Sequence, residues 1–180
     1  PISPSLYKSD IDYLNNLKCV IESKINIFQF RSKTLSFRRK RYLLNKIAMM
    51  CQDNNVKLII NDEYNLIKTF DLDGLHIGSN DKDLIAARKY FGKKIIIGKS
   101  CYNSMDLAKY SMDNGASYVS FGAMYPTKSK DSAIMAKHSV LINAKKIIKI
   151  PICVIGGINK SNMSTLMQYR PDMICMITGI

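Results

Sequence analysis

Short apolar runs alternate with longer amphipathic stretches along the whole chain. Seven of these runs are bounded by polar or turn residues, a pattern that predicts buried strands: residues 25–30, 56–60, 74–77, 94–98, 118–121, 150–155 and 173–177. Helical spacing predicts helices between them, several opening with a Ser, Asp or Asn suited to an N-cap: residues 9–23, 36–53, 81–91, 104–114, 140–149 and 159–168, with a partial helix at best at 63–70. No hairpin signal interrupts the alternation, so we expect a parallel sheet with right-handed crossovers.

The number of predicted strands bears on the fold class. The stretch Pro1-Ile2-Ser3-Pro4 looks like the tail of a first strand, and a closing helix would follow Ile180. We therefore expect an α/β fold of the (β/α)8 TIM-barrel type, lacking most of its first strand and its last helix, as one domain over residues 1–180. An open α/β sheet is the alternative. The barrel is preferred because polar residues cluster just after the strands, where such barrels build active sites.

Composition and charge narrow the classes of function. The 180 residues are 47% apolar, as in a globular domain, and 27 Lys+Arg against 14 Asp+Glu give a net charge of +13. This charge suits nucleic acid, an anionic membrane or small anionic substrates. Most lysines are scattered, and the one dense basic run, residues 38–41, leads into apolar residues at helical spacing, which indicates a solvated helix face. We expect small anionic substrates, no nucleic acid and no membrane, and leave a homo-oligomer open.

The cysteines and the lengths of the apolar runs indicate a compartment. Five cysteines form no C-x-x-C pair and several lie in apolar runs, so we interpret them as small core residues of a protein in a reducing environment: Cys19, Cys51, Cys101, Cys153 and Cys175. No apolar run approaches the roughly 18 residues of a membrane span, and no signal segment opens the chain. We expect a cytoplasmic protein.

The stretch from Tyr118 to Lys130 holds the best candidate for anion binding. A predicted strand stops at Gly122 and opens into a loop that Pro126 stiffens. Hydroxyl and ammonium donors follow, with no carboxylate until residue 131: Thr127, Ser129 and Lys130. Phosphate or pyrophosphate would suit this loop. A solvated turn with ordinary surface lysines is the alternative.

The first clear strand ends in three polar residues at alternating positions. Gln29, Arg31 and Lys33 would point the same way, toward the mouth of a barrel. An exposed strand end with basic residues is the alternative. A buried, unpaired amide is costly, however, so Gln29 inside an apolar strand favours a functional role.

Carboxylates follow the next two predicted strands. Asn61 and Asp62 come directly after residues 56–60, and Asp81 follows the segment that contains His76. Two carboxylates at neighbouring strand ends could share Mg²⁺, which prefers oxygen ligands and needs only one or two from the protein. A turn and a helix N-cap are the alternative. His76 lies inside a strand, where we expect a structural role.

Small residues follow the remaining strands. Ser100 opens a polar stretch after residues 94–98, although with little specificity. Gly156-Gly157 and Thr178-Gly179 follow the last two strands, where bare amides form the recurrent phosphate site of barrels. For Gly156-Gly157 a tight strand-to-helix turn is an equally good interpretation, and both can hold at once.

The ordered set Gln-x-Arg-x-Lys, Asn-Asp, Gly-x-His-x-Gly…Asp, Gly-x-x-Tyr-Pro-Thr-x-Ser-Lys, Gly-Gly-Ile and a final apolar strand resembles the thiamine-phosphate synthase family. The likeness covers nearly the whole chain from Ile25. It implies a (β/α)8 transferase of thiamine biosynthesis that joins hydroxymethylpyrimidine diphosphate to a thiazole phosphate with Mg²⁺ and releases pyrophosphate. The exact form of the thiazole is left open.

The resemblance also implies roles for matching residues. Lys130 would neutralise the leaving pyrophosphate, Ser100 would approach the pyrimidine, and Mg²⁺ would be held by Asp62 and Asp81. The other residues would bind substrate, first the pyrimidine diphosphate and then the thiazole phosphate: Gln29, Arg31, Lys33 and Asn61; Thr127, Ser129, Gly157, Ile177 and Thr178.

Three positions depart from the family pattern: Ser79 where Gln is common, Ser129 where Thr is usual, and Ala123 where Pro is common. The related thiazole tautomerase shares the barrel but carries a His where Ala123 stands, so the synthase is preferred. A tautomerase-like protein or an inactive phosphate-binding barrel is the alternative. A nucleic-acid-binding protein would need clustered basic residues with interleaved aromatics, which the sequence does not show.

Overall fold

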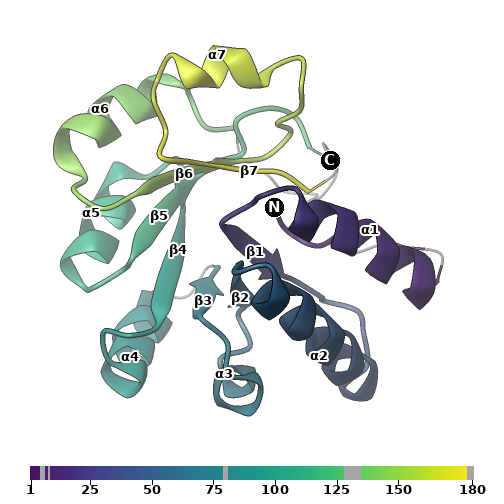
Figure 1. Ribbon diagram of the computed structural model, residues 1–180. Coiled ribbons are helices and arrows are strands. Elements are labelled where there is room, and N and C mark those ends of the chain that lie inside the picture. Colours follow the sequence, from purple (N-terminus) through teal and green to yellow (C-terminus); the bar gives the residue numbers. More distant parts are fainter. Residues whose placement is uncertain (5–6, 8, 79–80, 128–134, 178–180) are drawn as a thin grey trace. The chain divides into compact units, whose positions relative to one another are not determined.

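The computed structural model describes residues 1–4, 7, 9–78, 81–127 and 135–177, and for residues 81–83 it describes the backbone alone. The chain divides into two compact units, Pro1–His76 and Ile77–Ile180. Helices and parallel strands alternate in both (Figure 1). The expected parallel α/β alternation is therefore confirmed.

The first unit consists of α1 (Asp10–Glu22), β1 (Ile27–Phe30), α2 (Phe37–Asp53), β2 (Lys57–Asn61), α3 (Asn65–Phe70) and β3 (Gly74–Ile77), whose last residue begins the second unit. β1 pairs with β2 and β2 with β3, both in parallel. Ile2 adds a one-residue parallel bridge to Gln29, which is consistent with the expected tail of a strand before α1.

Serine caps begin both long helices of this unit, as the sequence predicts. The Ser9 hydroxyl accepts a hydrogen bond from the Asp12 N–H, and the Ser36 hydroxyl accepts one from the Arg39 N–H. The two helices lie side by side (Figure 1), and the Arg39 guanidinium donates to the Asp10 carboxylate at 2.8 Å. The buried face of α2 combines one charged residue with an apolar stripe: Lys40, Leu43, Leu44, Ile47 and Cys51.

The second unit continues with α4 (Asp81–Phe91), β4 (Ile96–Tyr102), α5 (Met105–Asp113), β5 (Tyr118–Phe121), α6 (Ser139–Ile147), β6 (Ile152–Ile155), α7 (Met163–Met167) and β7 (Met173–Cys175). β4 to β7 pair in chain order, all in parallel. Val119 and Phe121 pack into one buried cluster with residues of α5, α6 and α7. By alternation Tyr118 and Ser120 face the other side of the sheet.

Polar residues just before three strands satisfy backbone groups of the preceding strand. The Asp73 carboxylate accepts from the Leu58 N–H at 2.9 Å, and the Asp172 carboxylate accepts from the Ile152 N–H at 2.8 Å. The Ser117 hydroxyl accepts from the Ile97 N–H at 3.0 Å. These bonds join the amino-terminal ends of neighbouring strands.

Several element boundaries differ from the predictions, most of all those of β4 and α7. β4 runs on to Tyr102 because it continues to pair with β5 beyond Gly98, where an added Cβ would lie 2.0 Å from a carbon of the Tyr118 ring. Ser100 is therefore inside the strand, paired with Ser120, and not after it. α7 is shorter than predicted because the Asn162 side chain accepts from the Asn159 N–H, and this turn occupies the start of the expected helix.

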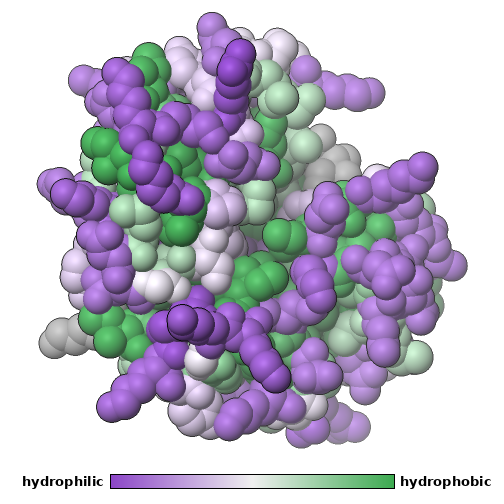
Figure 2. Space-filling model, turned by 60° about the vertical axis from the view of Figure 1, so that its left-hand side comes forward, coloured by the Kyte–Doolittle hydropathy of each residue, from purple (hydrophilic) through white to green (hydrophobic). Residues whose placement is uncertain are grey.

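Burial corrects two further expectations. Lys40 of the basic run is buried and not solvated, whereas Arg38, Arg39 and Arg41 are exposed. Three cysteines are buried as expected, but Cys19 is exposed and Cys175 is half-buried. Figure 2 shows hydrophilic residues over much of one face, with hydrophobic patches between them. Among the described residues, no helix is long and apolar enough to cross a membrane.

Candidate active site

The carboxyl end of β1 presents a buried polar atom. Gln29 is 6% exposed, and its Oε1 has no hydrogen-bond partner within the described part of the chain. Its backbone is satisfied, since its N–H donates to the Pro1 carbonyl and its carbonyl accepts from the Ser3 N–H. A buried acceptor without a donor is costly. The arrangement therefore suits a ligand N–H.

Arg31 and Lys33 lie beyond the end of this strand. β1 ends at Phe30, so the strand alternation that would place Gln29, Arg31 and Lys33 on one face does not extend to Arg31 and Lys33. The Arg31 backbone is held by the Ser3 hydroxyl, which accepts from its N–H at 2.8 Å and donates to its carbonyl at 3.1 Å. Arg31 is half-buried and Lys33 is exposed.

The chain turns sharply where β2 ends. Asp62 has φ 61°, in the left-handed region that Asp tolerates better than most residues. Its N–H donates to the His76 carbonyl at 2.9 Å, and the Asn61 carboxamide donates to its carboxylate at 2.7 Å. Asp62 is exposed, and the amide of Asn61 orients its carboxylate.

These side chains supply hard oxygen atoms of the kind that Mg²⁺ prefers. Within the described residues no group of three or more His, Cys, Asp or Glu side chains could hold a metal. Mg²⁺ does not need such a group, because it commonly takes one or two carboxylates and completes its shell with water and phosphate. Asp81 begins α4, but its side chain lies outside the described residues. His76 is buried inside β3, as expected of a structural residue.

The loops after β5 and β6 are packed backbone to backbone. A Cβ on Gly122 would lie 2.2 Å from the Ile155 carbonyl oxygen, and one on Gly157 would lie 2.4 Å from the Pro126 carbonyl oxygen. The Met124 N–H donates to the Ile155 carbonyl at 3.0 Å. Gly157 also has φ 64°, which favours glycine. The glycines therefore allow the loop that carries Thr127 to lie against the loop after β6.

The remaining predicted site residues of the second unit are only partly described. Ser100, Thr127 and Ile177 are half-buried; Ser100 lies inside β4, whereas Thr127 and Ile177 lie beyond the ends of β5 and β7. Ser129, Lys130 and Thr178 lie outside the described residues.

Sequence reasoning missed two buried lysines. The Lys40 ammonium pairs with the Glu63 carboxylate, next to Asp62 in sequence. Lys99 is fully buried, and its ammonium donates to the Gly78 carbonyl at 3.1 Å. A signal was present for Lys40, which stands three residues before Leu43 and so extends the apolar stripe of α2 by one turn.

Parallel strands that alternate with helices and carry polar residues at their carboxyl ends are typical of α/β enzymes, barrel enzymes among them. The model of the family described as thiamine monophosphate synthase matches residues 2–180. The chain therefore belongs to the thiamine monophosphate synthase family, and the expected class, a transferase, is confirmed with it.

Relatives and solved structures agree with this assignment. The chain is 40% identical to the thiamine-phosphate synthase of Pelagibacter ubique over 93% of its length and 81% of that protein, and 38% identical to the thiamine-phosphate synthase of Nitrosomonas eutropha over 87% and 74%. It is similar in fold to the thiamine phosphate pyrophosphorylase of Pyrococcus furiosus, with a TM-score of 0.81 and 24% identity over 92% of this chain and 79% of that one. The barrel-type fold expected from the sequence is thus confirmed.

Proposed function

We propose that this protein joins hydroxymethylpyrimidine diphosphate to thiazole phosphate and releases pyrophosphate in thiamine biosynthesis. Membership of the family supports the reaction class. The observation that carries the proposal is the buried Oε1 of Gln29, which lacks a partner within the described chain. An aminopyrimidine offers the N–H that this acceptor needs.

The first unit would bind the pyrimidine diphosphate. Gln29 would accept from the amino group of the ring, and Asn61 would lie beside it. Arg31 and Lys33 follow the same strand and carry positive charge suited to the diphosphate. Their place at the carboxyl end of β1, where barrel enzymes bind substrates, supports this assignment.

Mg²⁺ would be held by Asp62 and Asp81. When bound, it would neutralise charge on the diphosphate and so favour its departure. The exposed Asp62 carboxylate, which Asn61 orients through a 2.7 Å hydrogen bond, supports the first half of this assignment. The second half is carried over from the family pattern in the sequence.

The reaction would be a largely dissociative displacement. The bond between the methylene carbon of the pyrimidine and the diphosphate oxygen breaks, and its electron pair leaves with pyrophosphate, whose charge Lys130 would neutralise while Ser100 lies near the pyrimidine. The lone pair of the thiazole nitrogen then forms the new carbon–nitrogen bond. No protein nucleophile is required, because positioning and electrostatics lower the barrier.

The thiazole phosphate would be held by the loops after β5, β6 and β7: Thr127, Ser129, Gly157, Ile177 and Thr178. The close approach of the Gly157 backbone to the loop that carries Thr127 supports a site made of backbone and hydroxyl groups. Such groups bind phosphate without added charge.

The test is a coupling assay with both substrates, followed by detection of thiamine phosphate and pyrophosphate. We expect product only with Mg²⁺ present and none after chelation. Thiazole tautomerisation without coupling would contradict the proposal and favour the tautomerase alternative. Ala123, which is buried and carries no group able to transfer a proton, leads us to expect no tautomerisation.

A further inference from the structure

The turn after β2 is held from two sides. On one side the Asp62 N–H donates to the His76 carbonyl of β3 at 2.9 Å, while the Glu63 N–H and the Tyr64 N–H close the turn onto Asn61 and Asp62. On the other side the Glu63 carboxylate pairs with the Lys40 ammonium of α2. The residue with the left-handed backbone, Asp62, lies between these two attachments.

Lys40 has no role in the reaction as proposed above, yet it is buried. Its side chain is 11% exposed, whereas Glu63 keeps 34% of its side-chain exposure. It stands on the face of α2 that packs into the first unit, in line with Leu43 and Leu44. An ammonium is strongly hydrated, so such a position requires a partner of opposite charge. Glu63 is that partner.

We propose that Lys40 is a positioning residue for the metal site: by holding Glu63, it fixes the backbone that aims the Asp62 carboxylate. This inference rests on the proposed function, in which Asp62 binds Mg²⁺. Lys40 lies on a helix behind the turn and acts through Glu63, so it is not itself a catalytic residue. Partners that orient metal ligands typically affect metal affinity 10- to 100-fold when removed.

The experiment compares full-length variants in two measurements. The first is the Mg²⁺ concentration that gives half of the maximal coupling rate, and the second is the rise in melting temperature that Mg²⁺ causes without substrates. We expect Lys40→Met to raise the half-saturating Mg²⁺ concentration about 10-fold or more and to reduce the Mg²⁺-dependent rise in melting temperature. The rate at saturating Mg²⁺ should fall less.

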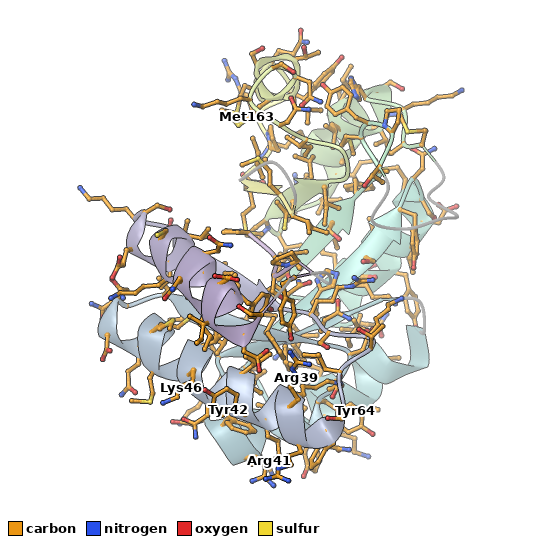
Figure 3. All side chains as sticks on the ribbon, turned by 90° about the vertical axis from the view of Figure 1, so that its right-hand side faces the viewer. Arg39, Arg41, Tyr42, Lys46, Tyr64 and Met163 are labelled. Atoms are coloured by element: carbon orange, nitrogen blue, oxygen red, sulfur yellow. The ribbon has the colours of Figure 1, made fainter. Side chains whose placement is uncertain are left out.

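Further variants separate the ion pair from general effects of charge. Glu63→Gln should reproduce the weaker Mg²⁺ response, and it keeps the proposal testable if Lys40→Met does not fold, because Glu63 is partly exposed. Lys40→Arg keeps the charge and the donors and should restore most of the Mg²⁺ affinity. Lys46→Met is the matched control, since Lys46 is exposed on the same helix (Figure 3). It should leave both measurements unchanged.

The double variant Lys40→Met/Glu63→Gln removes both charges. If the pair acts by fixing the turn, the double variant will need as much Mg²⁺ as Lys40→Met. Recovery of wild-type Mg²⁺ affinity in the double variant would overturn the positioning role, because it would show that only the uncompensated charge mattered.

Failure of this inference is distinguishable from failure of the proposed function. A wild-type chain that binds Mg²⁺ but does not couple the substrates refutes the function, while the melting-temperature measurement still decides the role of Lys40. A wild-type chain that couples, with unchanged Mg²⁺ dependence in Lys40→Met and Glu63→Gln, refutes the inference alone. A wild-type chain that shows no response to Mg²⁺ in either measurement refutes both.

Discussion

The two ends of the strands use polar groups in opposite ways. At the amino-terminal ends, polar side chains bond to the backbone of the preceding strand, as Asp73, Ser117 and Asp172 do. At the carboxyl end of β1, by contrast, Gln29 keeps a buried oxygen without a partner in the described residues. The polar side chains at the amino-terminal ends therefore stabilise the sheet, whereas the buried oxygen of Gln29 carries an energetic cost that a ligand would offset.

The Arg88 side chain makes the contrast sharper. Its guanidinium donates to the carbonyls of Gly92, Ile95 and Gly115 and to the Ser117 hydroxyl. All of these partners belong to the turns that precede β4 and β5. Together they occupy most of the N–H donors of the guanidinium group. Such a residue stabilises the fold and has few hydrogen-bond donors left for a ligand.

The largest effect is expected at Asp62. The substitution Asp62→Asn keeps a residue that tolerates φ 61° and removes one carboxylate charge. Because a metal contributes several kcal/mol to catalysis, the coupling rate should fall roughly 100-fold or more while the melting temperature changes little. Steady-state kinetics and thermal unfolding measure the two effects.

The control for that variant is Asp53→Asn at the exposed end of α2, which should affect neither quantity. An Asp62→Asn enzyme with wild-type kinetics would remove Asp62 from the site. The contrast between the two ends of the strands would then rest on Gln29 and on the closely packed loops after β5 and β6.

The second largest effect is expected in the loops after β5 and β6, which pack against each other at glycine residues. Gly157→Ala would place a Cβ 2.4 Å from the Pro126 carbonyl oxygen, while Gly92→Ala, at nearly the same backbone angle (φ 67° against 64°), meets nothing within 4 Å. We expect Gly92→Ala to cost about 1 kcal/mol of unfolding free energy and Gly157→Ala about 3 kcal/mol. Denaturant unfolding measures both, and the difference isolates the steric contact from the backbone angle. Equal losses would contradict close packing of the two loops.

Substitution of Gln29 should weaken substrate binding without lowering stability. Gln29→Met removes a buried acceptor that lacks a partner in the described chain, so stability should stay the same or rise. The KM for the pyrimidine diphosphate should rise roughly 3- to 10-fold, since one neutral hydrogen bond is worth about 1 kcal/mol. Calorimetry and initial rates test this together. A clear loss of stability with unchanged KM would place Gln29 among the structural residues.

The smallest effect concerns pH and the amino-terminal ends. Partial burial raises the pKa of Asp172, but hydrogen bonds from the Lys145 ammonium and the Ile152 N–H more than offset this, so the net pKa lies below the usual aspartate value. A lowered pKa stabilises the folded state above the ordinary aspartate pKa of about 3.9, and this contribution is lost as pH falls through the lowered value.

Asp172→Asn should therefore cost about 1 kcal/mol at pH 7 and less at pH 3, with no change in the KM for either substrate. Unfolding curves at the two pH values measure this, with Asp113→Asn on exposed α5 as the control. An equal loss at both pH values would mean that the carboxylate charge is not what stabilises the start of β6.

Local pattern alone predicted much of the fold. β3, α4 and β5 have the predicted bounds, and the serines expected to cap α1, α2 and α5 do so. The order of polar motifs at strand ends also indicated the family, which comparison confirmed. These features depend on residues close in sequence or on spacing along one strand or helix, and such information is present in the chain before it folds.

Contacts between distant segments decided the rest. The extension of β4 depends on its pairing with β5, and the burial of Lys40 depends on Glu63, 23 residues away. The shortening of α7 is instead a local effect, since Asn162 accepts from the N–H of Asn159. Only Lys40 stands in a local pattern that indicates burial, and that pattern does not identify Glu63 as its partner. A charged residue, a glycine or an amide looks the same in the sequence whether it lies in solvent or in a packed interior. Only tertiary packing determines which of these environments surrounds it.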